Sequence, residues 1–169
     1  MTKNSAFIYD PKLRVVFKPL SFDKYSFMPA NNDPILFGFF HNLLSKHQNK
    51  NFRKRILKCL SAKNLFIIDN SSGEIVGVLS YNVKKSLPDE VCDLFGVNKN
   101  AKNVKLYLIA VKEMEPSNLE PVVKDVISVL ENYNPNIIWL RMIFSETPLS
   151  DAMIRCGFIK KDDVTAYIF

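Results

Sequence analysis

The residues best suited to chemistry lie where an apolar run, residues 104–111, meets a helical pattern that begins near Asn118. A strand, a turn and a helix in this order can bind a phosphate group. They do so when glycines let backbone N–H groups approach the anion and the start of the helix adds its free amides. This turn contains no glycine. It carries two acidic residues and two prolines instead: Glu115, Glu120, Pro116 and Pro121.

Both residue types disfavour an anion at this corner. A carboxylate a few ångströms from a phosphate costs about 1 kcal/mol per pair even in bulk water, and Pro121 removes an amide from the first turn. With Asn118 as the N-cap, Pro121 would be the third helical residue, where its missing N–H costs no helical bond. Glu120 would then lie near the positive end of the helix dipole. The corner is therefore predicted to stabilise its own helix instead of a ligand, and no cofactor is expected.

A ligand that did bind there would meet a short set of residues. The candidate cofactor-binding residues are Val111, Lys112, Glu113, Met114 and Asn118. Glu113 is also the one carboxylate beside the strand end that suits a general base, although the same residue type is common at a solvated strand end.

No metal or thiol site is predicted. His41 and His47 are six residues apart and fall on different faces of a helical pattern, so a shared metal ion is not expected. The three cysteines, Cys59, Cys92 and Cys156, are odd in number and widely spaced, which suits neither a disulfide framework nor a zinc site.

Positive charge is concentrated in one segment. Seven basic residues lie between Lys46 and Lys63 with no acidic residue among them, in a chain whose net charge is +6. The pattern over residues 51–63 predicts a helix with a basic outer surface. The candidate partner-binding residues are Lys50, Arg53, Lys54, Arg55 and Lys58. Three alternatives stay open: a solvated helix face, a site for an acidic protein partner, or a nucleic-acid site with six or seven phosphate contacts.

Length and composition predict a single domain over residues 1–169. The chain is 47% hydrophobic, which is enough for one sizeable core, and its 169 residues are too few for two ordinary domains. No apolar run approaches the roughly 18 to 20 residues that span a bilayer, and the first ten residues do not resemble a signal peptide. We therefore expect a soluble, intracellular, cytoplasmic protein that neither enters a membrane nor is secreted.

The order of predicted elements is a mixed α/β order. Asp33 and Pro34 mark the start of a buried helix, and the residues from Asn70 to Gly73 mark a hairpin turn. Residues 86–103 are predicted to be an inserted loop or short helix. The remaining predicted elements are a first strand over 13–22, a central strand over 104–111 with a helix after it, a strand over 136–144, a short helix closed by Gly157 and a last strand over 162–169.

Four segments carry a resemblance to a known family. They are "EIVGVLSY" in the hairpin, "LYLIAV" in the central strand, "NIIWLRM" in the next strand and "SDAMIRCGF" in the closing helix. Together with the element order, they resemble the GCN5-related N-acetyltransferase (GNAT) superfamily over nearly the whole chain. The resemblance implies a central mixed sheet of about six to seven strands flanked by about four helices, with acetyl-coenzyme A as acyl donor. It also implies that the first two helices border the acceptor groove.

The sequence departs from that family at two places. Family members resemble Arg/Gln-x-x-Gly-x-Gly/Ala at the corner after the central strand, where this chain has the glycine-free turn. Members often place a tyrosine four residues before the glycine of the closing helix, where its hydroxyl can protonate the leaving thiolate. That position is Met153 here, which has no proton to give.

Three functions remain open from the sequence. The first is an acetyltransferase-like subunit with an eroded acetyl-coenzyme A site, acting in interaction or assembly. The second is an active N-acetyltransferase with an atypical loop, and the third is a basic RNA-binding or ribosome-associated subunit. A fainter resemblance, in "NLFIIDNSSGEIVGVLSY" and "LYLIAVKEME", to the acetyltransferase-like modules of cilia- and flagella-associated proteins implies a cytoskeletal or ciliary setting.

Overall fold

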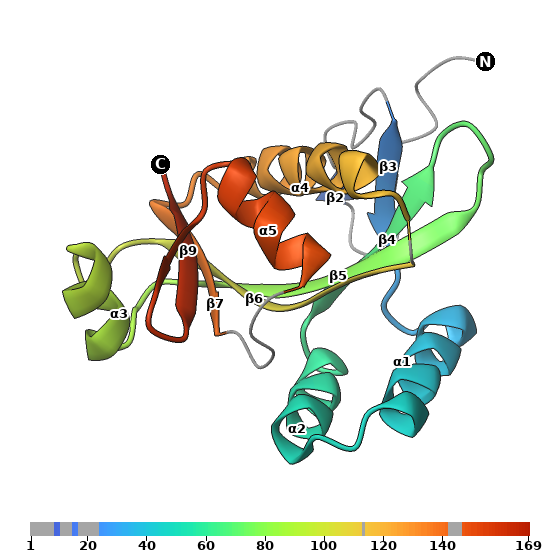
Figure 1. The fold of residues 1–169 in the computed structure, drawn as a ribbon, viewed down its shortest axis with the longest axis horizontal. Coiled ribbons are helices and arrows are strands. Elements are labelled where there is room, and N and C mark those ends of the chain that lie inside the picture. Colours follow the sequence, from blue (N-terminus) through green and yellow to red (C-terminus); the bar gives the residue numbers. More distant parts are fainter. Residues whose placement is uncertain (1–8, 11–14, 17–23, 113, 142–146) are drawn as a thin grey trace.

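The fold is a mixed sheet with helices on both faces (Figure 1). The computed structural model describes residues 9–10, 15–16, 24–112, 114–141 and 147–169. The strands are β1 Tyr9–Asp10, β2 Val15–Val16, β3 Tyr25–Pro29, β4 Lys63–Asp69, β5 Ile75–Lys84, β6 Asn103–Val111, β7 Ile137–Arg141, β8 Ile159–Lys161 and β9 Val164–Ile168. The helices are α1 Pro34–Lys46, α2 Lys50–Cys59, α3 Asp89–Phe95, α4 Pro116–Glu131 and α5 Pro148–Arg155.

Seven strands form the main sheet in the order β3-β4-β5-β6-β7-β9-β8, and β1 pairs with β2 in a separate two-stranded ribbon. Every neighbouring pair in the main sheet is antiparallel except β6 and β7, which are parallel. The mixed α/β class predicted from the sequence is confirmed, with seven strands in the sheet. The described residues contain five helices because the 86–103 segment forms α3, which ends at Gly96 with a left-handed φ of 66°.

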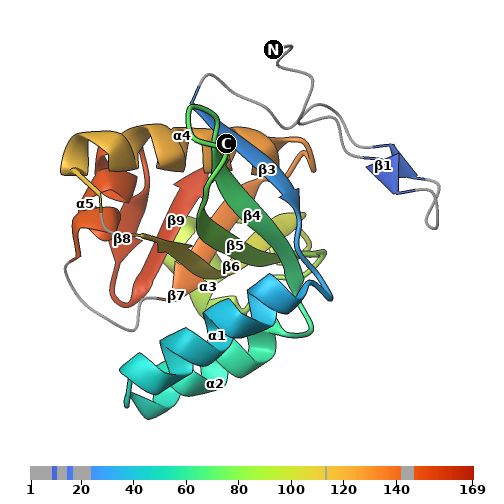
Figure 2. The ribbon, with the colours of Figure 1, turned by 90° about the vertical axis from the view of Figure 1, so that its right-hand side faces the viewer.

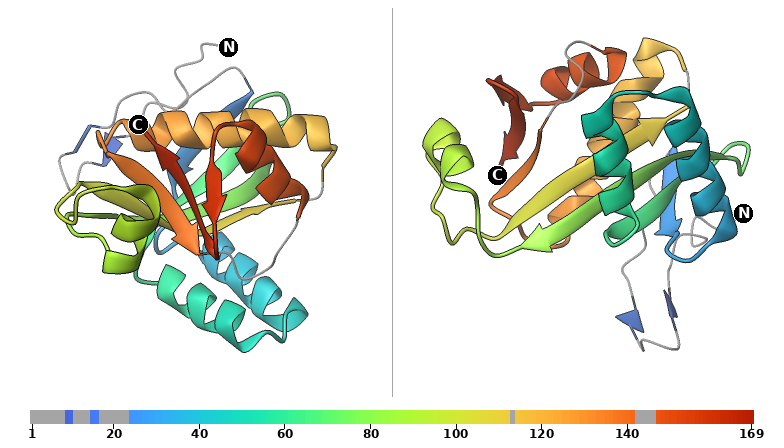
Figure 3. Two further views of the ribbon diagram at one scale, coloured as in Figure 1. Left: turned by 60° about the vertical axis from the view of Figure 1, so that its left-hand side comes forward. Right: turned by 90° about the horizontal axis from the view of Figure 1, so that it is seen from below.

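The two faces of the sheet carry different helices. α4 and α5 cover one face, while α1 and α2 lie side by side on the other (Figures 2 and 3). α3 packs on the α1–α2 face at the β7–β9 end, because it shares a cluster with Ile137 and Trp139. Their neighbours along β7, Ile138 and Leu140, belong to the α4–α5 cluster on the opposite face.

Apolar side chains form three buried clusters. Those of α4 pack on β6 and β7, with Val122 and Leu130 fully buried. On the opposite face one cluster lies under α1 and α2 around Phe52 and Ile56, and the second lies under α3 around Trp139. These two clusters on the same face remain separate.

Several predictions about local structure are confirmed. Asp33 caps α1 by accepting the N–H of Ile35 at 2.9 Å, with Pro34 as the first helical residue. The hairpin turn between β4 and β5 contains Gly73 at a φ of 73°, a backbone conformation that favours glycine. Among the described residues, no helix is long and apolar enough to cross a bilayer.

Two predictions were wrong in part. Of the strand predicted over residues 13–22, Val15 and Val16 form β2 and pair with β1, and the other residues lie outside the described residues; within the described residues, the first strand of the main sheet is β3, Tyr25–Pro29. Pairing with β4 selects β3, because it buries Tyr25 and Phe27. α1 is not a buried helix: Leu36 and Phe40 are its buried residues, and Phe37 is 47% exposed, because α1 rests on the sheet and α2 along one side only.

Candidate functional site: a channel between β6 and β7

The site begins where two neighbouring strands part. β6 and β7 pair over three residues, with Asn103, Val104 and Lys105 opposite the start of β7. Beyond these residues β6 and β7 no longer pair with each other, although β6 continues as far as Val111 and β7 as far as Arg141. A parallel pair that opens in this way leaves a gap in the middle of the sheet, bordered on the β6 side by an unpaired strand edge.

A β-bulge in β6 lies at the start of this gap. Ser80 and Tyr81 are adjacent in β5, but their partners in β6 are Leu108 and Leu106, so Tyr107 is the extra residue. As a result Tyr107 and Leu108 both pack toward the α1–α2 face. Bulges bend a strand and redirect its side chains, and they are common beside active sites.

The alternation of β6 directs backbone polar groups into the gap. The N–H of Lys112 donates to the carbonyl of Val76 in β5 at 2.8 Å, so Lys112 faces β5. Because successive residues of a strand face opposite neighbours, Val111 and Ile109 direct their N–H and C=O groups toward the β7 side. This edge has the form that an extended ligand with amide groups can join as an added strand.

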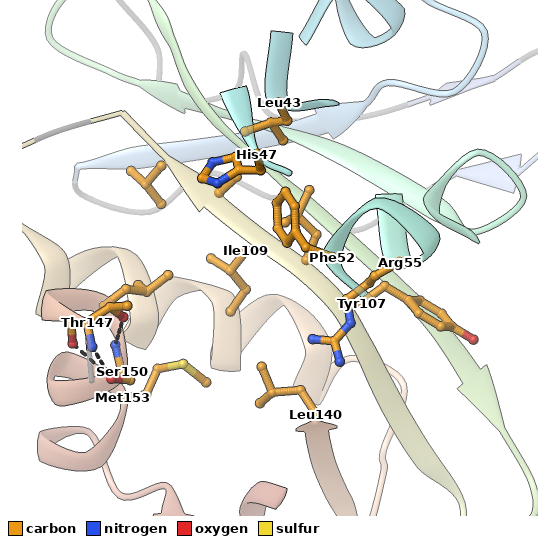
Figure 4. A pocket seen from close by; sticks show the side chains of 14 residues that line it. Leu43, His47, Phe52, Arg55, Tyr107, Ile109, Leu140, Thr147, Ser150 and Met153 are labelled. Atoms are coloured by element: carbon orange, nitrogen blue, oxygen red, sulfur yellow. Dashed lines mark hydrogen bonds between the residues drawn. The ribbon is translucent and has the colours of Figure 1, made fainter. Parts of the chain in front are cut away.

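A cavity of about 380 Å³ occupies the gap and is lined from both faces of the sheet (Figure 4). His47, Phe52 and Arg55 line it from the α1–α2 side, and Ser150 and Met153 line it from α5. The cavity is therefore a channel through the sheet. Its lining is mainly apolar, as expected for a site that binds an uncharged chain.

His47 is a channel residue that sequence reasoning missed. It follows the last residue of α1, and its ring centroid lies 4.7 Å from that of Phe52. Figure 4 shows its imidazole beside the channel. The described residues contain no group of three or more His, Cys, Asp or Glu side chains that could hold a metal ion. No local pattern in the sequence indicates that the end of α1 reaches the opening of the sheet.

On the α5 side of the channel, Met153 has no proton to donate, and the hydroxyl of Ser150 already donates within the cap of α5. Met153 is buried and points toward Leu140 in Figure 4. One turn earlier, the hydroxyl of Ser150 donates to the carbonyl of Thr147 at 2.9 Å as part of a capping box. Thr147 is the N-cap of α5, and its hydroxyl oxygen accepts the N–H of Ser150 at 3.1 Å.

The corner after β6 differs from its predicted form. Glu115, not Asn118, is the N-cap of α4, and Pro116 is its first residue. The helix begins earlier because a proline fits the first position, where an N–H would have no partner. Pro121 consequently lies inside the helix, where it removes one helical hydrogen bond.

Few of the predicted cofactor-binding residues reach the channel. Val111 lines it. The N–H of Lys112 is used by β5, and its ammonium group pairs with Glu74 at 3.1 Å. Met114 packs against the core of the α4–α5 face, and the N–H of Asn118 donates to the carbonyl of Glu115. Glu113 lies outside the described residues, and its catalytic role stays a prediction.

The five predicted partner-binding residues separate into two groups. Lys54, Arg55 and Lys58 line a second cavity on the α2–α3 face, which also contains Lys105 and Arg141. Lys50 does not line this cavity, and Arg53 is engaged elsewhere, since its guanidinium donates to the carbonyls of Leu44 and His47. The basic outer surface predicted for α2 is present, since Lys50, Arg53, Lys54 and Lys58 are exposed.

Lys105 gives this region a measurable electrostatic property. Burial lowers the pKa of Lys105 to about 8, and the nearby positive charges of Lys84, Lys58, Arg141 and Arg55 add to the effect. Between pH 8 and 10.5 the unfolded chain then binds more protons at this residue than the folded protein does. The contribution of Lys105 to stability is therefore unfavourable below pH 8 and improves as the pH rises toward 10.5.

Replacing Lys105 tests this property. We expect Lys105→Met to raise the Tm at pH 7 by about 2 °C, a small gain because part of the side chain reaches water, and the gain should disappear by pH 10. Thermal unfolding followed by circular dichroism at both pH values would measure it. Lys124→Met is the matched control, because Lys124 is exposed on α4 at the opposite face and loses the same charge. An equal change in both variants would contradict the assignment.

The cysteines do not provide a nucleophile. Burial raises the pKa of Cys59 to about 11 and also raises the pKa of Cys156, so both remain thiols near neutral pH. Cys156 donates its S–H to the carbonyl of Glu120 across the α4–α5 contact. All three cysteines, Cys59, Cys92 and Cys156, are free.

Solved structures resemble this fold although the sequences have diverged. No protein-family model and no curated protein matches the sequence. The structure of Arabidopsis thaliana NAA60 with acetyl-CoA aligns with a TM-score of 0.59 and 14% identity, covering 86% of this chain and 99% of that one. A GNAT family acetyltransferase from Elizabethkingia anophelis with acetyl-CoA bound aligns with a TM-score of 0.55 and 15% identity, covering 88% and 100%. The NatC complex bound to Gag peptide and CoA aligns with a TM-score of 0.56 and 11% identity, covering 86% and 99%.

The element order, the sheet that opens between a parallel pair and these alignments define the class of fold. The chain has the fold of the GCN5-related N-acetyltransferases. The fold predicted from the four sequence segments is therefore confirmed.

Proposed function

We propose that the protein binds the acylated pantetheine arm of acetyl-coenzyme A in the channel and transfers the acyl group to an amine. The observation that carries this proposal is the opening between β6 and β7, where the unpaired edge of β6 borders a cavity of about 380 Å³. The arm contains amide groups in an extended chain, which suits added-strand pairing with Ile109 and Val111. Two solved structures with the same fold hold acetyl-CoA.

The channel and the corner differ in how well they suit this donor. The channel is apolar and has backbone groups along one edge, so it fits the arm. At the corner, Pro116 has no N–H, the amides of Lys112 and Asn118 are already bonded, and Glu115 is an exposed residue. The residues present therefore do not fit the diphosphate. We infer that binding depends on the arm and that the diphosphate contributes little.

The chain supplies only part of the chemistry of acyl transfer. The acyl donor, when bound, presents a thioester. The amine nitrogen forms a bond to the acyl carbon, the C–S bond breaks, and the nitrogen loses a proton. His47 is the imidazole that lines the channel from the acceptor side, and we propose that it receives this proton. Because Met153 has no proton for the departing thiolate, slow transfer is expected.

Two departures from the acetyltransferase pattern, at the corner after β6 and at Met153, favour a second function. A glycine-free corner and Met153 are the features expected of a non-catalytic interaction subunit, for which a cytoskeletal or ciliary setting was predicted. In this alternative the channel would hold no thioester, and the basic face of α2 would bind an acidic partner. RNA binding on the same surface has less support, for the reasons given in the next subsection.

Calorimetric titration with acetyl-coenzyme A and with S-acetyl-pantetheine separates these functions. We expect both to bind, with dissociation constants within about tenfold of each other, because the arm makes the contacts. A corner that gave two or three charge-assisted hydrogen bonds to the diphosphate would favour acetyl-coenzyme A by about 100-fold or more.

Each other outcome of the titration has a definite meaning. A strong preference for acetyl-coenzyme A would contradict the inference about the corner. Failure of both compounds to bind at millimolar concentration would contradict the proposed function and favour the non-catalytic subunit. Coenzyme A without the acetyl group is the control for binding of the arm alone.

A further inference from the structure

The second cavity is lined by several positively charged side chains. It has a volume of about 440 Å³ and lies on the α2–α3 face of the sheet. Five cationic side chains and one carboxylate line it: Lys54, Arg55, Lys58, Lys105, Arg141 and Asp163. We refer to it as the basic cavity. Its cations come from α2, β6 and β7, so the tertiary fold brings them together.

The cations of the sheet are held in place by aromatic rings. The ammonium group of Lys105 lies 5.3 Å from the ring centroid of Tyr107 and 5.0 Å from that of Trp139. The guanidinium of Arg141 lies 5.9 Å from the Trp139 ring. Trp139 is itself fixed, because its indole N–H donates to the buried side chain of Asn103 at 2.9 Å. These contacts distinguish the basic cavity from a set of solvated lysines.

Most of this charge has no carboxylate partner. Arg141 pairs with Glu90 at 2.7 Å and with Asp163 at 3.4 Å. Across the described residues, no ion pair is formed by Lys54, Lys58 or Lys105, and Arg55 forms none either. Burial is the main cause that lowers the pKa of Arg55, whereas the charges of Lys84, Lys58, Arg141 and Arg55 repel that of Lys105 and add to the lowering of its pKa by burial. A bound anion would relieve this repulsion.

The basic cavity continues into the channel. Arg55 and Tyr107 line both spaces. In Figure 4 the guanidinium of Arg55 points into the opening, above Leu140 and to the right of Ile109. A molecule whose amine enters the channel from the α1–α2 side therefore has its adjoining groups beside the cations.

We propose that the basic cavity binds carboxylate groups of an acidic peptide whose amine is the acceptor in the channel. The role of the peptide as acceptor rests on the proposed function, whereas its binding to the basic cavity does not. Arg55 supplies a planar donor that suits a carboxylate, and Lys54 and Lys58 add charge along the same side of α2. A cavity of this size suits one or two such groups.

The geometry argues against RNA as the occupant. Tyr107 and Trp139 are buried at 8% and 1% exposure, so their faces are not available for base stacking. The outer basic residues Lys50 and Arg53, which a phosphate backbone would need to follow, do not line the basic cavity. The cations form a recess and not a long basic track.

The test compares an acidic hexapeptide that has a free amino terminus with its amide version, in which every Asp is Asn and every Glu is Gln. Binding is followed by calorimetry at low salt, without acetyl-coenzyme A. We expect the acidic peptide to bind at least tenfold more tightly than the amide peptide, with the difference shrinking at high salt. Lys105→Met should remove most of that difference, whereas Lys124→Met should change it less than twofold.

The controls make the outcomes distinguishable. Lys105→Met and Lys124→Met lose the same charge, so equal weakening would mean non-specific attraction and would overturn the proposal. Tight binding of a single-stranded RNA that Lys105→Met does not affect, with no binding of the peptide, would also overturn it. Peptide binding without any binding of S-acetyl-pantetheine would leave the cavity assigned while the acyl-transfer function fails.

Discussion

Met153→Tyr is expected to raise the rate of acyl transfer by about 100-fold. The residue lies on α5 at the channel wall, in the position where enzymes of similar sequence pattern often carry a tyrosine. A tyrosine hydroxyl at this position would give a proton to the departing thiolate, and general acids of this kind contribute about 10² to 10⁴ in rate. The measurement is release of free thiol from S-acetyl-pantetheine or acetyl-coenzyme A, with an acidic peptide as acceptor.

Met153→Phe is the matched control for this gain. It brings an aromatic ring of nearly the same size without the hydroxyl, so any effect of overpacking in the α4–α5 cluster should appear in both variants. We expect the phenylalanine variant to stay at or below the rate of the unchanged protein. Equal rates in the two variants would show that the missing proton is not what limits transfer. If neither protein turns over although the thioester binds, His47 and Glu113 become the residues to test as bases.

Much of the fold could be predicted because its signals are local. The hairpin turn at Gly73, the N-cap at Asp33 and the buried face of α2 each depend on residues close in sequence. The apolar run that became β6 was equally clear. The strand β3 was missed because its five residues gain their stability from pairing with β4, which a local pattern does not show.

The channel itself could not be predicted from spacing. It exists because β6 and β7 pair for three residues and then part, and because Tyr107 is an extra residue in one strand. Both are properties of register between distant segments. The sequence analysis placed the candidate cofactor site among residues 111–118, of which Val111 lines the channel, and the helix starts at Pro116 and not after Asn118.

The sequence contains two single residues that indicate the basic cavity. Arg141 and Lys105 are single charged residues within strands that are otherwise almost entirely apolar. A charge in a buried strand needs a partner or an opening, so each pointed to a break in the core. The sequence could not show that both would meet the basic residues of α2, since that depends on α2 crossing β6.

Asn103→Ala is expected to cause the largest loss of stability, because one buried side chain connects four parts of the fold. Its amide nitrogen, whose two hydrogens are shared among three acceptors, lies within 3.3 Å of the carbonyl oxygens of Lys84, Ser86 and Ala101, and its oxygen accepts the indole N–H of Trp139. Asn103 is fully buried at the point where β6 and β7 begin to pair.

Alanine would leave these groups without partners. Each unsatisfied buried polar group costs about 1 to 3 kcal/mol, so a loss of about 4 kcal/mol is expected even if water reaches some of them. For a chain of this length that corresponds to a fall in Tm of about 10 °C or more. Asn98→Ala is the control: its side chain accepts one hydrogen bond, from the N–H of Asn100, in an exposed turn, and should shift the Tm by little.

The same variant also links stability to function. Trp139 supports both Lys105 and Arg141, so freeing its indole should loosen the basic cavity before the protein unfolds. We therefore expect Asn103→Ala to weaken acidic-peptide binding at temperatures well below its own Tm, whereas binding of S-acetyl-pantetheine should change less, because we propose that this arm pairs with β6 beyond the bulge. If Asn103→Ala loses the expected stability but binds the acidic peptide normally, then Trp139 keeps its position without Asn103.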